Sequence, residues 1–188
     1  MSVIVPSLKQ AQALLYENIL DPQIRKHCEA TRVKANQIAT LVSTKIRCNL
    51  KLVEIGSLLH DIGRARIHDV THGYVGGQIL QIHHYPQSVV KIVERHVLGG
   101  FSNIEATKVG LPNRDFIPQT LEEKIVCVAD KLGAFEWNGI QQPHRWLTEV
   151  NNRLDELTKR YGLAEPYQTS MQRARHFTNE LVELAISK

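Results

Sequence analysis

The stretch "SLLHDIGRARIHDVTHGYVGG", residues 57–77, places a histidine next to a carboxylate at the end of an apolar run. Leu58 and Leu59, which precede the pair, indicate a buried position. An ionised carboxylate in an apolar interior is costly unless a cation, a network of donors or a shifted pKa compensates it. His60 and Asp61 therefore predict a bound cation or a polar network. His72 follows within the same stretch.

The segments on either side of this stretch have apolar residues spaced by three and four positions, which is typical of helices. Residues 7–19 form a short amphipathic segment, and Asp21 with Pro22 fits the N-cap and first position of the next helix. "SNIE" from Ser102 and "TLEE" from Thr120 each predict a capping box at the start of a further helix. The sequence therefore predicts an all-α fold.

Residues 50–63 are apolar on nearly every side, which predicts a central helix. Gly63 fits the C-cap of this helix, so His60 and Asp61 would occupy its last turn. Further along the chain, residues 143–187 contain two amphipathic helices. We expect a single domain over 1–188, with a core at about 20–135 and a C-terminal helical extension at about 143–187.

Three more polar residues lie on helical faces that are otherwise apolar. His27 shares a stripe with Cys28 and Ile38, His96 follows a stripe of valines, and Asp130 ends the apolar segment "KIVCVAD". A lone histidine in such a place is usually a core residue that is bonded to a backbone carbonyl. Several ligands of the N and O type without sulfur instead suit Fe, Mn, Co, Ni or Zn.

The sequence at this point resembles the HD superfamily of metal-dependent phosphohydrolases. The family signature is a His on one helix, a His-Asp pair on the next and a distant Asp, and "HDIG" stands at residues 60–63. The resemblance covers about residues 20–135 and implies an all-helical HD fold with metal bound inside the bundle. It implies that the metal ligands include His27, His60, Asp61 and Asp130.

Binuclear members of the superfamily add two histidines between the pair and the last Asp. His72 in "HGYVGGQIL" and His96 in "IVERHVLGG" are similar to that addition, with Asp61 as the residue that bridges two ions. Val97 follows His96, and "GYP" is absent from the chain, so the sequence disfavours the HD-GYP cyclic dinucleotide phosphodiesterases.

The resemblance implies hydrolysis of a phosphoester or phosphoanhydride, because one or two bound divalent ions can activate water and hold phosphoryl oxygens. His60 and Asp61 are the expected catalytic residues. Arg64, directly after the metal-binding turn, and Lys131, next to Asp130, are the cations nearest to the ligands in sequence and are expected to bind substrate phosphate. The expected substrate is a small phosphorylated metabolite, most plausibly a nucleotide or a dinucleoside polyphosphate.

Two alternatives stay open at this point. HD-fold oxygenases with a mixed-valent di-iron centre use a very similar set of six ligands, and an HD fold can also serve as a non-catalytic nucleotide-binding module. Turnover of nucleotides with Mn or Fe favours the hydrolase, oxygen consumption favours the oxygenase, and ligand-shifted melting without turnover favours the binding module.

The composition indicates which classes of partner and which cellular compartment to expect. The formal net charge is +4 over 188 residues, and the basic residues are scattered, so there is no strong sign of nucleic-acid binding. The three cysteines are isolated, no apolar run is long enough for a membrane helix, and the N-terminus lacks a signal-peptide core, which together predict a cytoplasmic protein. The oligomeric state is left open.

The remaining polar and aromatic residues of interest have simpler interpretations. Surface positions are expected for His68, Asp69, His83, His84, His144 and His176. Trp137 and Trp146 are expected to anchor the packing of the C-terminal helices.

Overall fold

The computed structural model describes residues 5–132, 139–162 and 164–187. These residues form helices and connecting turns, with no strand among them, so the predicted all-α class is confirmed. The α-helices are α1 (Leu8–Asn18), α2 (Pro22–Ser43), α3 (Leu50–Leu59), α4 (His72–Ile82), α5 (Gln87–Arg95), α6 (Asn103–Lys108), α7 (Leu121–Ala129), α8 (Trp146–Tyr161) and α9 (Tyr167–Ile186). Short 3-10 turns are η1 (Ile62–Ala65), η2 (Gly139–Gln141) and η3 (Pro143–Arg145).

The helix starts follow the side chains that satisfy their first backbone N–H groups. Asp21 accepts a bond from the N–H of Gln23 and precedes Pro22, as predicted. Ser102 forms a complete capping box with Glu105. Thr120 provides only half of the predicted box, because the Glu123 carboxylate accepts from the N–H of Gln119 instead of returning to the cap residue.

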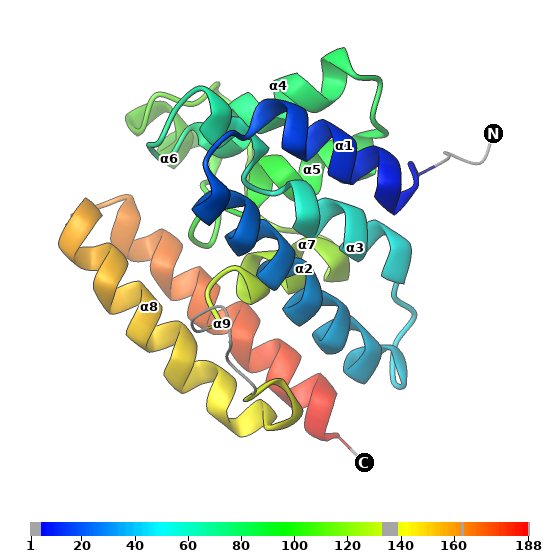
Figure 1. Ribbon diagram of the computed structural model, residues 1–188. Coiled ribbons are helices and arrows are strands. Elements are labelled where there is room, and N and C mark those ends of the chain that lie inside the picture. The colour runs from blue at the N-terminus through cyan, green and yellow to red at the C-terminus, as the bar shows by residue number, and fades with distance from the viewer. Residues whose placement is uncertain (1–4, 133–138, 163, 188) are drawn as a thin grey trace.

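Helix α7 lies at the centre of the bundle, in contact with α2, α3, α5 and α9 (Figure 1). Its residues from Ile125 to Ala129 are all fully buried, which is expected for an unbroken apolar run inside a helix bundle. Asp130 follows directly as its C-cap. The central helix therefore delivers a carboxylate into the interior of the fold.

The C-terminal helices α8 and α9 form a hairpin that packs beside the bundle (Figure 1). Val150, Leu154 and Phe177 belong to the same buried cluster as residues of α2 and α7. Trp146 is fully buried and donates from its Nε1 to the carbonyl of Ile140, so its predicted role in packing is confirmed. Trp137 lies outside the described residues.

The predicted end of the central helix is wrong. Helix α3 ends at Leu59 with His60 as its C-cap, and the chain continues into η1 after Asp61. Gly63 is not a C-cap but a point of close contact, because a Cβ there would lie 1.9 Å from the carbonyl oxygen of His72. The backbone of α4 thus packs directly on Gly63, which fixes His72 relative to Asp61.

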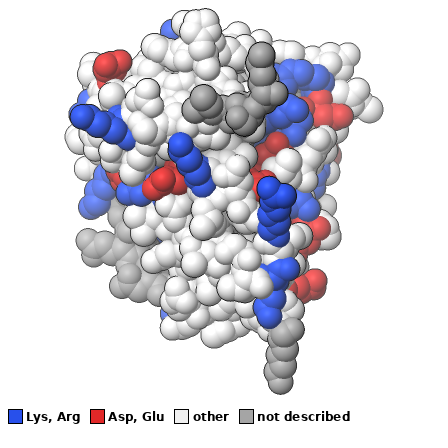
Figure 2. All heavy atoms as spheres, turned by 90° about the vertical axis from the view of Figure 1, so that its right-hand side faces the viewer, with Lys and Arg blue, Asp and Glu red and all other residues white. Residues whose placement is uncertain are grey.

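The charged residues on the face shown in Figure 2 are mixed in sign, with lysines and arginines next to aspartates and glutamates. This agrees with the scattered basic residues of the sequence. Within the described residues, no helix combines the length and the hydropathy that crossing a membrane would require.

Candidate metal centre

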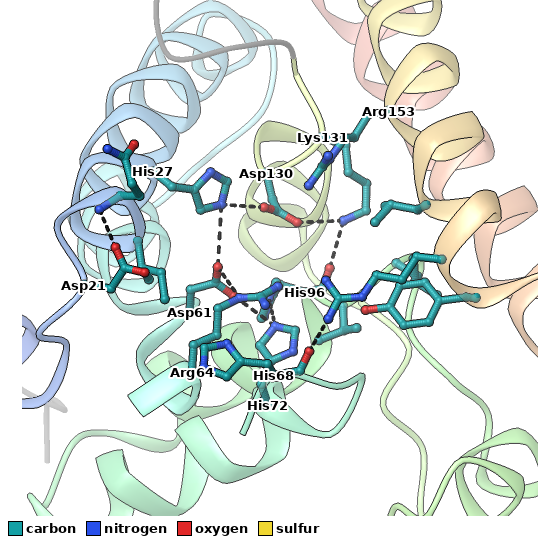
Figure 3. Close-up of a pocket in the computed structure, with 17 residues that line it drawn as sticks. Asp21, His27, Asp61, Arg64, His68, His72, His96, Asp130, Lys131 and Arg153 are labelled. Carbon is teal, nitrogen blue, oxygen red and sulfur yellow. Dashed lines mark hydrogen bonds and ion pairs between the residues drawn. The ribbon is translucent and has the colours of Figure 1, made fainter. Parts of the chain in front are cut away.

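The six predicted ligands come from five different helices and meet at one place. His27 lies on α2, His60 and Asp61 directly follow α3, His72 begins α4, His96 caps α5 and Asp130 caps α7. Figure 3 shows His27 and Asp130 facing each other, with Asp61 between them and the lower group of His72 and His96.

Three of the ligands form a first group around the end of α7. The Nε2 atom of His27 lies 3.1 Å from the Nε2 atom of His60 and 2.9 Å from an oxygen of Asp130. The same Asp130 oxygen lies 3.3 Å from Nε2 of His60. Three donor atoms of the N and O type therefore converge within the reach of a single ion.

A second group forms around the start of α4. The Nε2 atoms of His72 and His96 lie 3.1 Å apart, and Oδ1 of Asp61 lies 2.9 Å from the first and 3.5 Å from the second. The other oxygen of Asp61 faces the first group, at 3.7 Å from Nε2 of both His27 and His60. Asp61 thus presents one carboxylate oxygen to each group.

The hydrogen bonds of the histidine rings indicate which ring nitrogen faces the other ligands. Each of three rings donates from Nδ1 to the backbone carbonyl three residues before it, with distances of 2.7 Å for His60, 2.5 Å for His72 and 2.7 Å for His96. Because Nδ1 holds the proton of a neutral ring, each Nε2 presents a lone pair to the other ligands. Lone pairs and carboxylate oxygens that face one another at these distances favour a cation between them, so the donor set fits divalent metal.

The backbone adds to the attraction for a cation. His60, His96 and Asp130 are the C-caps of α3, α5 and α7, so three helix C-termini end at the site. A helix C-terminus carries a partial negative charge of about half an elementary charge. Side chains and backbone therefore both favour positive charge at the same point.

The protonation states agree with metal binding. Burial alone would raise the pKa of Asp61, but the His60 and His72 rings lower that pKa well below its ordinary value. Burial would likewise raise the pKa of Asp130, and Lys131, with the neighbouring histidines, lowers it well below its ordinary value. Burial lowers the pKa of His96 to about 4, so this ring is neutral at pH 7 and can act as a ligand.

The two predicted substrate-binding cations both contact the carboxylates of the site. Arg64 lies with Nε 2.6 Å from Oδ2 of Asp61. Lys131 is only 1% exposed, and its ammonium group donates to the carbonyls of His96 and Cys127 as well as to Asp130 at 3.2 Å. Lys131 therefore holds Asp130 and the helix C-termini in place, a supporting position that its place in the sequence did not indicate.

A cavity of about 400 Å³ opens above the ligands. Sequence reasoning missed one wall of it, to which helix α8 contributes Arg153, Leu157, Arg160 and Tyr161. Their helical spacing was visible in the sequence, but no signal indicated that α8 docks against the site. Figure 3 shows Arg153 beside Lys131 and across the cavity from His27.

The histidines and the aspartate expected at the surface are exposed in the structure: His68, Asp69, His83, His84, His144 and His176. His68 nevertheless lines the cavity, and its carbonyl accepts a bond from Arg160.

Comparison with known proteins agrees with this arrangement. The HD domain family model matches residues 24–134, which include all six ligands and end before α8. An uncharacterized protein of Methanocaldococcus jannaschii is 40% identical over 119 residues, 63% of this chain and 70% of that protein. A tRNA (cytidine(56)-2'-O)-methyltransferase of Picrophilus torridus is 38% identical over 128 residues, 68% of this chain but only 36% of the methyltransferase.

A solved structure has the same fold. The HD domain of the L. monocytogenes phosphodiesterase PgpH, in complex with cyclic-di-AMP, aligns with a TM-score of 0.51 at 16% sequence identity. The alignment covers 95% of this chain and 98% of that one, so the likeness in fold extends beyond the residues that the family model matches.

Proposed function

The chain belongs to the HD-domain family, and on that basis we propose that it is a metal-dependent phosphohydrolase with a binuclear centre. The observation that carries the proposal is the convergence of Nε2 lone pairs and carboxylate oxygens in two groups that share Asp61. Buried charges of this kind require a cation or a partner for each of them. In the described structure one oxygen of Asp61 is buried without a hydrogen-bond donor.

The ligands divide between the two ions as their distances do. His27, His60 and Asp130 would hold one ion, His72 and His96 the other, and Asp61 would contribute an oxygen to each. Divalent ions bound in this way supply a water of lowered pKa and positive charge for phosphoryl oxygens. Fe, Mn, Co, Ni and Zn all suit ligands of this type.

Other residues orient the ligands and meet the substrate. Lys131 orients Asp130, and the backbone carbonyls that accept from Nδ1 fix the ring planes of the histidines. Arg64 holds one oxygen of Asp61 through Nε and lines the cavity, so its other N–H groups are placed to donate to a substrate phosphate.

The proposed substrate is a nucleotide or a dinucleoside polyphosphate. The cavity volume is within the range of small-molecule sites, roughly 300–1,000 Å³, and arginines line it next to the apolar surface of Leu157 and Tyr161. The fold neighbour PgpH has been solved with a bound dinucleotide, which supports this substrate class.

Incubation of mono-, cyclic and dinucleotides and dinucleoside polyphosphates with the chain and Mn²⁺ or Fe²⁺, with the products separated by chromatography, would test the proposal. We expect turnover by the native chain, the same rate with and without oxygen, and loss of turnover in Asp61→Asn. His176→Ala is the matched control, because that histidine is exposed and lies outside the cavity. A metal-loaded protein that hydrolyses none of these nucleotides would refute the hydrolase.

A further inference from the structure

One face of α8 is turned towards the metal centre. Arg153, Leu157, Arg160 and Tyr161 all line the cavity that contains the metal ligands, and they follow one another at spacings of four, three and one residues. Residues with this spacing share one side of a helix. Lys159, which lies beside them in sequence, is exposed and does not line the cavity.

The two arginines on this face are not part of the buried core. Both are exposed, whereas Leu154 on the inner side of the same helix is fully buried. Arg153 pairs with Glu156 one turn away, and Arg160 donates from one nitrogen to the carbonyl of His68. A guanidinium has five N–H donors, so each arginine keeps donors for a further acceptor.

The other two residues of this helix face, Leu157 and Tyr161, provide apolar and aromatic surface. Leu157 and Tyr161 are half-buried, and the Tyr161 ring stacks on Tyr167 of α9 with the centroids 5.4 Å apart. The stacking holds the Tyr161 ring in place within the cavity wall. The face thus alternates cationic and apolar groups, which is the chemistry of a compound that carries both phosphate and a ring.

The cations of the cavity come from different parts of the chain. Arg64 and Lys131 contact the carboxylates Asp61 and Asp130 of the metal centre, whereas Arg153 and Arg160 line the cavity from α8 and bond to none of the metal ligands. A phosphate at the metal centre would therefore leave the remaining donors of the α8 arginines for a further anion. The family model ends at residue 134, so this wall is outside the part of the chain that carries the shared signature.

We propose that Arg153 and Arg160 of α8 form a second phosphate subsite, and that the substrate carries at least one phosphate group besides the one that is hydrolysed. This rests on the proposed function for the position of the first phosphate at the metal centre. Leu157 and Tyr161 contact the organic part of the substrate between its two anionic ends. Helix α8 thus determines which substrate binds, and the metal centre hydrolyses it.

The test is the binding of three adenine nucleotides to the full chain with and without Mn²⁺, measured by isothermal titration calorimetry. AMP has one phosphate group, whereas ADP and adenosine 3′,5′-bisphosphate have two in different arrangements. We expect Arg153→Ala and Arg160→Ala each to weaken the better of the two-phosphate probes about 10-fold, and AMP less than 2-fold, since a charge-assisted hydrogen bond contributes about this much.

Two further variants separate contact from general charge. Lys159→Ala removes the same charge from the same helix outside the cavity, so its binding should match the native chain. Arg160→Lys retains the charge and should recover part of the lost affinity. In turnover assays the arginine variants should raise KM for the two-phosphate substrate and leave kcat unchanged, since the loss would be one of binding alone.

Equal weakening of AMP and of both two-phosphate probes would overturn the subsite, and so would equal effects of Lys159→Ala and Arg160→Ala. If no nucleotide is hydrolysed but the selective loss of binding is found, the proposed hydrolase fails and the subsite stands. If AMP is hydrolysed and a second phosphate adds no affinity in the native chain, the subsite fails and the hydrolase stands.

Discussion

Metal stoichiometry gives the sharpest test of the centre, because the six ligands divide into two groups that share one residue. We expect about two ions per native chain, about one in His27→Ala or in His96→Ala, and fewer than one in Asp61→Asn. The reason is that each histidine belongs to one group, whereas Asp61 faces both, with an oxygen 2.9 Å from His72 and another 3.7 Å from His27.

The expected loss of stability follows from how much each substitution weakens metal binding. Loss of a partner that only orients a ligand weakens metal binding 10- to 100-fold, so loss of a ligand itself should cost at least about 100-fold. At metal concentrations about 100 times the native Kd, this removes about 2.3 kcal/mol of stabilisation per ion. For a chain of this length, that is roughly 5–9 °C of the metal-induced rise in Tm for each ion lost.

The assay combines metal analysis after dialysis with melting curves in the presence and absence of Mn²⁺. The readout is the shift that metal causes, because Asp61→Asn also removes the partner of Arg64 and changes the stability of the metal-free chain. His176→Ala, on an exposed side chain, should bind two ions. Two ions in His96→Ala, or one firmly held ion in Asp61→Asn, would refute the shared arrangement.

Three further outcomes are expected. Gly63→Ala should lower the free energy of unfolding, measured in urea, by roughly 3 kcal/mol or more, because the new Cβ would meet backbone atoms of α4. The control Gly110→Ala, in open space at φ +82°, should lower it by only about 1 kcal/mol. Equal losses in the two variants would contradict the close contact at Gly63. Lys131→Met should cost roughly 3 kcal/mol in the same assay, since it leaves two carbonyls and Asp130 without their donor; an unchanged midpoint would contradict this. Burial raises the pKa of Cys48 to about 11, so the thiolate fraction at pH 8 is about 100-fold lower than that of an ordinary cysteine. Labelling of Cys48 by a disulfide reagent should be slower by the same factor and should accelerate up to about pH 11. Labelling as fast as that of the unfolded chain would contradict this prediction.

The sequence predicted those features that depend on local pattern. His27 and Asp130 stand out because each interrupts an apolar helical face, and the structure brings their side chains to 2.9 Å. The capping residue Asp21 could be predicted because its bond is made within three residues. Such signals need no knowledge of how distant helices pack.

Features set by tertiary packing could not be predicted in this way. The end of α3 at Leu59 has no breaker in the sequence, and the role of Gly63 depends on the approach of α4. Lys131 resembles a surface cation until the carbonyls of α5 and α7 are seen around it. The arginines of α8 gain their position only because the C-terminal hairpin docks beside the metal centre.

The three helix C-termini that end at the metal centre have a consequence for the order of events. Arg64 and Lys131 balance the formal charges of Asp61 and Asp130, so the helix C-termini leave the floor of the cavity with a partial negative charge before any ion has entered. Such a floor disfavours a phosphate, whereas the arginines of α8 attract one. In the proposed hydrolase the anionic substrate would therefore bind after the cations, and the supply of metal would set the fraction of chains able to bind substrate.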